Sequence, residues 1–317
     1  MNQTPIVANA PNTATLSSMS GVGSKRGNRS IGEQDREKMN GKTIGKIGVG
    51  SWTFPWAIGT VLDHRPEKVL DPLGIVQRAK DLGVHVVHFL DNLPLDKCGD
   101  EAIGRAGEFA AQQAIEVEIG TRGTDPGHLF RYLEIAQKMG ARLVRTMGGW
   151  HGAPASLQEI DDNLSKVLPS FDDSGVRIAL ENYEAYRTSA LASLVARIGH
   201  PALGICLDLT NSFGALESAD EILANLVPFT ISVHLKEFAV ERLEFLMGFA
   251  FRGKPTGKGM LPLQKMFDAL AAASRQANVI VEQWPPFQDT LTKTMELELN
   301  WARESVEHLA TMGYLTK

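Results

Sequence analysis

Four residues that can bind a metal follow four successive apolar runs of the sequence. They are Glu181 in VRIALEN, Asp208 in LGICLD, His234 in ISVHLKE and Glu282 in NVIVEQW. A buried parallel strand reads as an unbroken apolar run, and in a barrel the carboxyl ends of such strands converge on one mouth. Clustered there, carboxylates repel one another or lose their charge unless a cation holds them. The pattern therefore predicts one divalent metal ion, and oxygen-rich ligands favour Mn²⁺ or Mg²⁺. An isolated Glu or Asp at the end of a strand is most often a solvated loop residue or a helix cap, so the prediction depends on the four residues together.

The elements that must position these residues alternate along the chain. Strand-like runs lie near residues 46–52, 84–90, 115–119, 142–146, 176–181, 203–208, 231–236 and 278–283. Helical patterns between them include Pro72–Leu82, His128–Met139, Leu157–Leu168, Ala190–Ile198, Ala219–Leu226 and Leu263–Ala272. This repetition is typical of an α/β protein with a (β/α)8 TIM barrel. An open doubly wound sheet is the alternative, but no GxGxxG turn follows the first run. We expect a single TIM barrel domain over residues 43–317.

Two segments are expected to lie outside the regular barrel. Residues 1–42 are rich in Asn, Thr, Ser, Gly and charge and show no helical or strand period, which predicts a disordered leader. Met39 is an alternative start of the protein. Residues 251–263, FRGKPTGKGMLPL, lie in the long interval between the seventh and eighth strands and suit a mobile loop that closes over the mouth.

Composition limits the class of partner. A net charge of −5 and 43% apolar residues allow a sizeable core and provide no basic field for nucleic acid. Cys98 and Cys206 form no CxxC pair, which favours a reducing compartment over a disulfide framework or a thiolate zinc site. The chain has no apolar stretch of the ~20 residues that cross a bilayer and no signal-peptide pattern. We expect a cytoplasmic protein that binds a small molecule, without nucleic acid or membrane; a homo-oligomer is compatible with the sequence.

Several motifs resemble one known family. The runs ENYEAY, CLDLTNS, HLKE followed by GKGMLPL, and VEQW are similar to the sugar phosphate isomerase/epimerase superfamily with the xylose-isomerase-like barrel, over roughly residues 44–313. The resemblance implies a carbohydrate substrate. It also implies that Glu181, Asp208, His234 and Glu282 bind one Mn²⁺, Mg²⁺ or Co²⁺ ion. By similarity to the ketose 3-epimerase branch, Glu181 and Glu282 are candidates for the catalytic acid and base.

Two departures from the epimerase pattern concern substrate binding. Arg187 stands where ketose 3-epimerases carry a second substrate-binding Glu, and Asn211 stands where they carry His. As a functional residue, Arg187 would hold a substrate carboxylate by a two-pronged hydrogen bond. As a structural one, it would pair with Glu184 or Glu181 at a capped helix entry. We predict Asn211 and Arg187 as substrate-binding residues, with the structural alternative open for Arg187.

Lys236 is the third departure, because the corresponding position is small in the epimerases. The HLK triplet looks more like the inosose dehydratase and related lyase branches. Residues two apart on a strand share a face, so Lys236 should lie on the same side as His234, nearer the mouth. We predict a catalytic role for it. The alternative is a rim lysine paired with Glu237 or Glu241.

Three further residues are predicted substrate contacts. Trp52 follows the first strand, Asn92 follows the second, and His88 lies within the second. Aromatic rings beside polar anchors suit the apolar C–H faces of a sugar. A packed corner formed by SWTFPW and a hydrogen-bonded core histidine are the structural alternatives.

The predicted function is that of a metal-dependent isomerase or epimerase on a keto sugar or sugar acid. Metal bound to adjacent hydroxyl and carbonyl oxygens makes the neighbouring C–H acidic and stabilises an enediolate. A lyase, either a dehydratase or a decarboxylase acting on a keto-sugar acid or keto-cyclitol, would use the same site. A barrel that binds without turnover is the third class, since fold alone does not determine function.

The leader hypothesis gives a first prediction. Deleting residues 1–38 should leave the melting temperature and turnover unchanged, because that segment has no periodic apolar face to pack on the core. Thermal unfolding and activity of the two chain lengths are compared. A fall of several degrees on deletion would show that the leader docks on the barrel or on another subunit.

Overall fold

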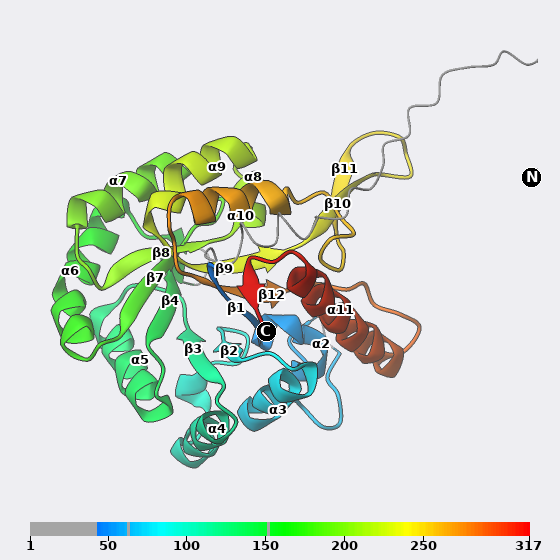
Figure 1. Ribbon diagram of the computed structural model, residues 1–317, viewed down its shortest axis with the longest axis horizontal. Coiled ribbons are helices and arrows are strands. Elements are labelled where there is room, and N and C mark those ends of the chain that lie inside the picture. The colour runs from blue at the N-terminus through cyan, green and yellow to red at the C-terminus, as the bar shows by residue number, and fades with distance from the viewer. Residues whose placement is uncertain (1–42, 62–63, 151–152) are drawn as a thin grey trace, which may run out of the picture.

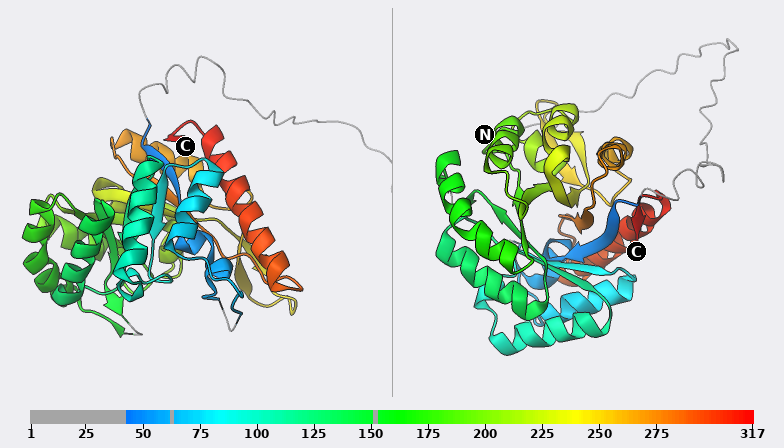
Figure 2. Two further views of the ribbon diagram at one scale, coloured as in Figure 1. Left: turned by 90° about the horizontal axis from the view of Figure 1, so that it is seen from below. Right: turned by 60° about the vertical axis from the view of Figure 1, so that its left-hand side comes forward.

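The computed structural model describes residues 43–61, 64–150 and 153–317. For Trp150 and Ala153 it describes the backbone and not the side chain. The predicted leader, residues 1–42, lies outside these residues. The described residues form the α/β TIM barrel that the sequence predicted, with helices surrounding a ring of strands (Figure 1, Figure 2). No helix among the described residues is both long enough and apolar enough to span a membrane.

Eight parallel strands form the barrel wall, one for each strand-like run of the sequence. They are β1 (Gly45–Gly50), β2 (Val86–Phe89), β3 (Glu116–Gly120), β4 (Leu143–Met147), β7 (Arg177–Glu181), β8 (Leu203–Leu207), β9 (Thr230–Lys236) and β12 (Asn278–Glu282). The barrel closes where Val49 of β1 pairs with Val281 of β12. The C-terminal β13 (Leu315–Thr316) pairs with the first residues of β1. The eight carboxyl ends therefore point to one mouth.

Helices cover the outside of this wall. They are α2 (Pro55–Ile58), α3 (Pro72–Leu82), α4 (Asp100–Gln112), α5 (Pro126–Met139), α6 (Leu157–Asp173), α7 (Thr188–Ile198), α8 (Leu209–Phe213), α9 (Ala219–Leu226), α10 (Leu263–Ala272) and α11 (Leu291–Thr311). The bounds of α3, α9 and α10 agree with the sequence prediction. Helix α6 extends through Pro169, beyond the predicted end at Leu168. Short 3-10 helices lie at η1 (Ser51–Thr53), η2 (Leu95–Lys97) and η3 (Val227–Phe229), and a short ribbon pairs β5 (Gly149–Trp150) with β6 (Ala153–Pro154).

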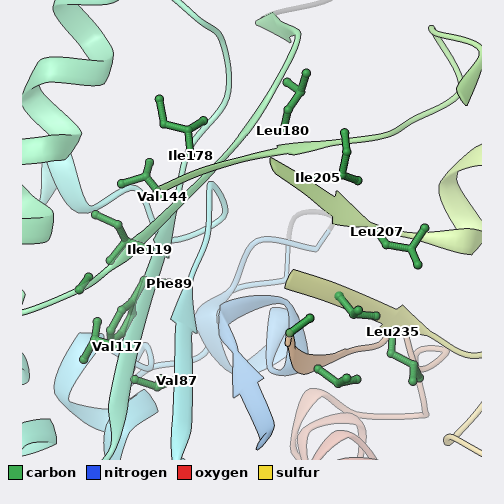
Figure 3. Packing of buried hydrophobic residues seen from close by; sticks show 14 of the residues in the cluster. Val87, Phe89, Val117, Ile119, Val144, Ile178, Leu180, Ile205, Leu207 and Leu235 are labelled. Atoms are coloured by element: carbon green, nitrogen blue, oxygen red, sulfur yellow. The ribbon is translucent and has the colours of Figure 1, made fainter. Parts of the chain in front are cut away.

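Alternation along the strands separates the hydrophobic core from the lumen. Leu180 and its neighbours on adjacent strands belong to the large core between strands and helices (Figure 3). Ala179 has the opposite parity and packs in the lumen with Leu143 and Cys206. Glu181 follows Ala179 by two residues and so shares the lumen face. The apolar run that buries β7 against the helices thus also directs its terminal carboxylate inward.

The interval between β9 and α10 differs from the sequence prediction. Residues 251–263 were expected to form a mobile loop, but Phe251–Gly253 belong to a hairpin of β10 (Phe238–Arg242) and β11 (Phe249–Gly253) that projects from the barrel (Figure 1). The following turn is tied down by Glu237, whose carboxylate accepts hydrogen bonds from Gly257 N at 3.0 Å and Leu261 N at 2.9 Å. The missed strand signal was the aromatic and β-branched content of FAVER and FAFRG.

The last long helix fixes the corner that follows β1. Glu298 of α11 is buried and accepts hydrogen bonds from Trp56 N at 2.7 Å and Ala57 N at 3.2 Å. These amides belong to the first turn of α2, where backbone donors have no partner within the helix. Gln283, next to the predicted ligand Glu282, donates to the carbonyl oxygens of Thr53 and Glu298. The end of β12 is therefore held by the same corner.

Glu298 gives a prediction about stability. Burial outweighs the two backbone hydrogen bonds and raises the pKa of Glu298 to about 8 from a reference of 4.5. Between these values the folded chain binds the extra proton, so the free energy of unfolding should fall as pH rises, by as much as about 5 kcal/mol. Urea unfolding of wild type and Glu298→Gln from pH 4.5 to 8 measures this. Their difference should change with pH, whereas Glu307→Gln, which removes an exposed carboxylate of α11, should follow wild type. Parallel curves for Glu298→Gln would contradict the prediction.

Candidate metal centre and active-site cavity

The four predicted metal ligands meet in the lumen near the carboxyl ends of their strands. Glu181 ends β7, His234 lies on β9, Glu282 ends β12, and Asp208 follows β8, all of them buried. His234 Nδ1 lies 3.1 Å from both Glu181 Oε2 and Glu282 Oε1. Ligand atoms of Asp208, His234 and Glu282 fall within 4.8 Å of one another. The structure thus brings together the constellation that the sequence predicted.

Local hydrogen bonds fix Asp208 in place. Its Oδ1 accepts from Asn211 N at 3.0 Å, which makes Asp208 the N-cap of α8. The side chain of Asn182 donates to the Asp208 carbonyl oxygen at 2.6 Å and accepts from its backbone N at 2.9 Å. With backbone and one carboxylate oxygen engaged, Oδ2 is the oxygen left for another partner.

Unpartnered ligand atoms test whether these residues fit a metal. Asp208 Oδ2, His234 Nδ1 and Glu282 Oε1 are buried and make no hydrogen bond of regular geometry within the described part of the chain. Buried polar atoms nearly always have partners, so three such atoms directed at one region require an explanation. Carboxylate oxygens with a single imidazole nitrogen are suitable ligands for Mn²⁺ or Mg²⁺. Together with Glu181, these residues therefore fit a divalent ion.

Cys206 is a potential fifth ligand, although the sequence, which has no CxxC pair, argued against a thiolate zinc site. It precedes Asp208 by two residues on the same face, and its sulfur groups with ligand atoms of Glu181 and His234. Burial raises the pKa of the Cys206 thiol. Because the thiolate is the form that binds metal, we assign the centre to the carboxylates and the imidazole.

Lys236 lies inside the cluster of ligands. Its Nζ is 2.7 Å from Asp208 Oδ2 and 2.9 Å from Glu282 Oε2, and it donates to Asn211 Oδ1 at 3.2 Å. The contact with Asp208 Oδ2 is a close charge pair without regular hydrogen-bond geometry. Burial lowers the pKa of Lys236, but Asp208, Glu282 and Glu181 outweigh it and hold that pKa well above its usual range. The ammonium is therefore part of the charge balance of the site.

The alternative of a rim lysine is wrong. Glu237 accepts hydrogen bonds from backbone amides of its own loop, and Glu241 pairs with Lys254 at 2.8 Å. Neither forms an ion pair with Lys236 among the residues that the structure describes. The strand-face argument for Lys236 thus predicted its position correctly.

Arg145 on β4 is a central residue that the sequence analysis missed. Its Nε donates to Glu181 Oε2, and its Nη1 donates to Asp91 Oδ1 at 3.1 Å and to the Thr121 carbonyl oxygen at 2.9 Å. Burial raises the pKa of Glu181, but the charge of Arg145 outweighs burial and holds this pKa well below its usual range. The sequence signal for it was a charged residue inside the apolar run RLVRT. Arg145 follows Leu143 by two residues, so both side chains lie on the same face of the strand.

His88 lies beneath the predicted metal ligands in the lumen. Its Nδ1 is 3.3 Å from His234 Nε2 and 3.5 Å from Glu118 Oε2, and the ring is fully buried. Burial, with His234 and Arg145, lowers the pKa of His88 well below 6.5, so the ring is a neutral imidazole. It contacts a predicted ligand rather than the surface of the cavity.

A cavity of about 520 Å³ opens above this cluster. The predicted residues in its lining are Trp52, Glu181, Asn211, Lys236 and Glu282, and further lining residues are Arg122, Arg145, Tyr183, Glu184, Gln283 and Trp284. Asn92 and Arg187 are not among the described lining residues. Asn92 is buried and donates to the Ser51 carbonyl oxygen at 3.0 Å, whereas Arg187 is exposed at the N-cap of α7.

Another cavity, of about 490 Å³, lies at the opposite end of the barrel beside Glu116 and Arg177 and contains none of the predicted site residues.

Comparison with known proteins identifies the family. The sequence model of the family described as "Xylose isomerase-like TIM barrel" matches residues 127–312. The chain is 31% identical over 268 residues to a protein of Pectobacterium atrosepticum named 3-oxo-isoapionate decarboxylase, covering 84% of this chain and 95% of the relative.

Solved structures show the same fold. D-psicose 3-epimerase from Clostridium cellulolyticum H10 with D-tagatose is 12% identical, with a TM-score of 0.64 over 85% of this chain and 99% of the epimerase. A xylose isomerase-like TIM barrel protein from Mycobacterium smegmatis in complex with magnesium is 15% identical, with a TM-score of 0.59 over 82% of this chain and 97% of the other. The family thus has epimerase and decarboxylase relatives and includes a protein that binds a divalent metal.

The metal assignment gives a prediction for Asp208→Asn. Wild-type protein should bind about one equivalent of Mn²⁺, and the variant should bind at least about tenfold more weakly, because a ligand charge is lost. Asn keeps an oxygen that can cap α8, so the fold should persist. Mn²⁺ titration by calorimetry measures the affinity.

A matched control is Asp71→Asn, since Asp71 caps α3 in the same way, accepting from Gly74 N at 2.8 Å. This control should bind Mn²⁺ like wild type. Unchanged Mn²⁺ affinity in folded Asp208→Asn would remove the basis of the metal centre.

Proposed function

Since the chain belongs to the xylose isomerase-like TIM barrel family, we propose that it is a divalent-metal-dependent decarboxylase of a 3-oxo sugar acid. The reaction would pass through an enediolate and fall within the lyase alternative of the sequence analysis. The observation that carries the proposal is the position of Lys236, whose ammonium lies 2.7 Å from Asp208 and 2.9 Å from Glu282 at the base of the cavity. The decarboxylase relative, similar over 84% of the chain, supports the same class of reaction.

Decarboxylation of a 3-oxo acid needs a place for an electron pair. The bond between the carboxyl carbon and its neighbour breaks, CO₂ leaves, and the electron pair passes onto the oxo group. A proton must then reach the carbon that carried the carboxylate. Held by Glu181, Asp208, His234 and Glu282, a divalent ion such as Mn²⁺ supplies Lewis-acid polarisation of the oxo and hydroxyl oxygens.

Lys236 would stabilise the negative charge that develops on the substrate. A preorganised cation in a site shielded from water acts mainly in the transition state, because it is already oriented before the charge appears. Only 20% of the Lys236 side chain is exposed, and Asn211 and two carboxylates hold its ammonium in place. The ammonium would therefore stabilise the developing charge without first having to be ordered, as the side chain of a flexible surface lysine would be.

The partners of the two glutamates favour a lyase over an epimerase. Epimerisation by two carboxylates requires each to take or give a proton on opposite faces of the sugar. Both oxygens of Glu181 already accept hydrogen bonds, Oε2 from Arg145 and Oε1 from Asn211 at 2.8 Å. Glu282 Oε1 has no such partner in the described residues. Glu282 would handle a proton in addition to binding the metal, while Glu181 would bind the metal alone.

The isomerase or epimerase function stays a prediction. The likeness to D-psicose 3-epimerase, at 12% identity, concerns the fold alone. A ketose 3-epimerase acts on a neutral sugar and releases nothing, so the two reactions are separated by their products. Cytoplasmic location and the identity of the ion, Mn²⁺, Mg²⁺ or Co²⁺, likewise stay proposals.

Lys236→Met should lower kcat by about 10² or more with little change in KM, as expected when a contact made in the transition state is lost. The assay follows CO₂ release and deuterium incorporation from 3-oxo-isoapionate and related 3-oxo sugar acids in D₂O. Lys293→Met is the control, because Lys293 is exposed on α11 and pairs only with Asp289 among the described residues. This variant should change kcat by less than about threefold.

Two outcomes would contradict the decarboxylase proposal. Reversible deuterium exchange without CO₂ release from any of these acids would support an isomerase instead. A Lys236→Met variant that decarboxylates at the wild-type rate would exclude the proposed role of the ammonium.

A further inference from the structure

We infer that Arg122, a residue outside all sequence predictions, forms the subsite that binds the carboxylate of the substrate. The inference rests on the proposed function, since it assigns the acid group of a sugar acid to one side chain. Arg122 follows β3 in the loop before α5, at the carboxyl end of the barrel, and its side chain lines the active-site cavity. The cavity also contains Arg145 and Lys236, but these two cations pair with predicted metal ligands, whereas Arg122 pairs with Asp91.

Hydrogen bonding leaves the outer part of the Arg122 guanidinium available. Its Nε donates to Asp91 Oδ2 at 2.7 Å, and its two Nη nitrogens make no hydrogen bond to any residue that the structure describes. The side chain is 44% exposed, as expected for a group that faces an open cavity. A guanidinium presents paired donors in a plane that match the two oxygens of a carboxylate.

Asp91 fixes the orientation of this guanidinium. One Asp91 oxygen binds Arg122 and the other binds Arg145 Nη1 at 3.1 Å. Burial raises the pKa of Asp91, but Arg145 and Arg122 outweigh it and keep this carboxyl ionised. Arg145 in turn binds Glu181, so an alternating series of charges connects Arg122 to the metal centre. The substrate carboxylate would be held at a fixed position relative to the metal.

Charge balance favours an anion at this position. The network holds four carboxylates and three cationic side chains, namely Asp91, Glu181, Asp208 and Glu282 with Arg122, Arg145 and Lys236. A divalent ion makes the positive charges of these ion-paired groups exceed the negative ones by one; the exposed Glu184, which also lines the cavity, belongs to none of these ion pairs. A ligand with one carboxylate restores neutrality among the ion-paired groups, whereas a neutral sugar does not.

Arg187, the carboxylate-binding residue suggested by the sequence, lacks these features. It is exposed at the N-cap of α7 and does not belong to the described lining of the cavity. Arg122 therefore replaces Arg187 in this role.

The test compares a sugar acid with its matched alcohol. Calorimetry on Mn²⁺-loaded protein measures binding of threonate and threitol to wild type, Arg122→Gln, Arg122→Lys, Arg187→Gln and Arg303→Gln. Arg122→Gln should weaken threonate binding by about tenfold or more and leave threitol binding unchanged, because one charge-assisted pair is lost. Arg122→Lys should fall between, since it keeps the charge and loses the fork. Arg303, exposed on α11, is the control and should change neither affinity.

Steady-state kinetics add a second readout. The carboxylate loses its charge as CO₂ forms, so Arg122 binds the ground state at least as well as the transition state. Arg122→Gln should therefore raise KM about tenfold with a smaller change in kcat.

Two results would overturn the subsite. In the first, Arg122→Gln binds threitol normally and keeps the full preference of the wild type for threonate. In the second, Arg187→Gln loses that preference instead. Failure of the proposed function is distinguishable from both. If the wild type releases no CO₂ but binds threonate through Arg122, the decarboxylase proposal is refuted and the subsite is retained. If Arg122→Gln decarboxylates at the wild-type rate with unchanged KM, the subsite alone is refuted.

Discussion

Uncompensated negative charge in the barrel lumen is the constraint on which the site depends. Glu181, Asp208 and Glu282 are each no more than 3% exposed, and three ionised carboxylates at such depth are costly unless cations surround them. Two cations are built into the chain, Arg145 beside Glu181 and Lys236 between Asp208 and Glu282. One negative charge is left among these groups, and a divalent ion at the candidate metal centre would more than offset it. The barrel scaffold can hold this arrangement because its outer wall, packed against the helices, provides the stability.

Much of the fold was predictable because one physical rule determines both strand burial and side-chain direction. Parallel strands covered by helices require continuous apolar runs, and the barrel wall supplies all eight at the predicted places. Period-two alternation then directs Glu181, His234 and Lys236 into the lumen. Helices α4 and α11, which the sequence analysis did not name, begin with less apolar sequence, DEAIGR and LTKTME. Their positions are determined by contacts such as that of Glu298 with α2.

The unpredicted parts of the site depend on partners distant in sequence. Arg145 and Arg122 are joined through Asp91, which lies in a different loop, and no local pattern shows that these three side chains meet. Attention to acids after apolar runs also favoured ligands and overlooked bases such as Arg122, which follows the run IEVEI in the same way. Arg187 illustrates the converse. Its alignment with an epimerase residue suggested a contact, but the backbone directs it to the entrance of α7.

The arrangement of cations also makes the two glutamates unequal. A symmetric pair of acid and base needs two carboxylates in similar surroundings, but Glu181 is enclosed by Arg145, Asn211 and His234, while Lys236 and His234 approach Glu282. An arginine cannot release its proton under ordinary conditions, so its partner is held as a permanent carboxylate. A lysine can approach the substrate as well as its carboxylate partners. Under the proposed function, one side of the site would be fixed for binding metal and the other suited to stabilising new charge. This asymmetry matches irreversible loss of CO₂ better than reversible proton exchange on two faces.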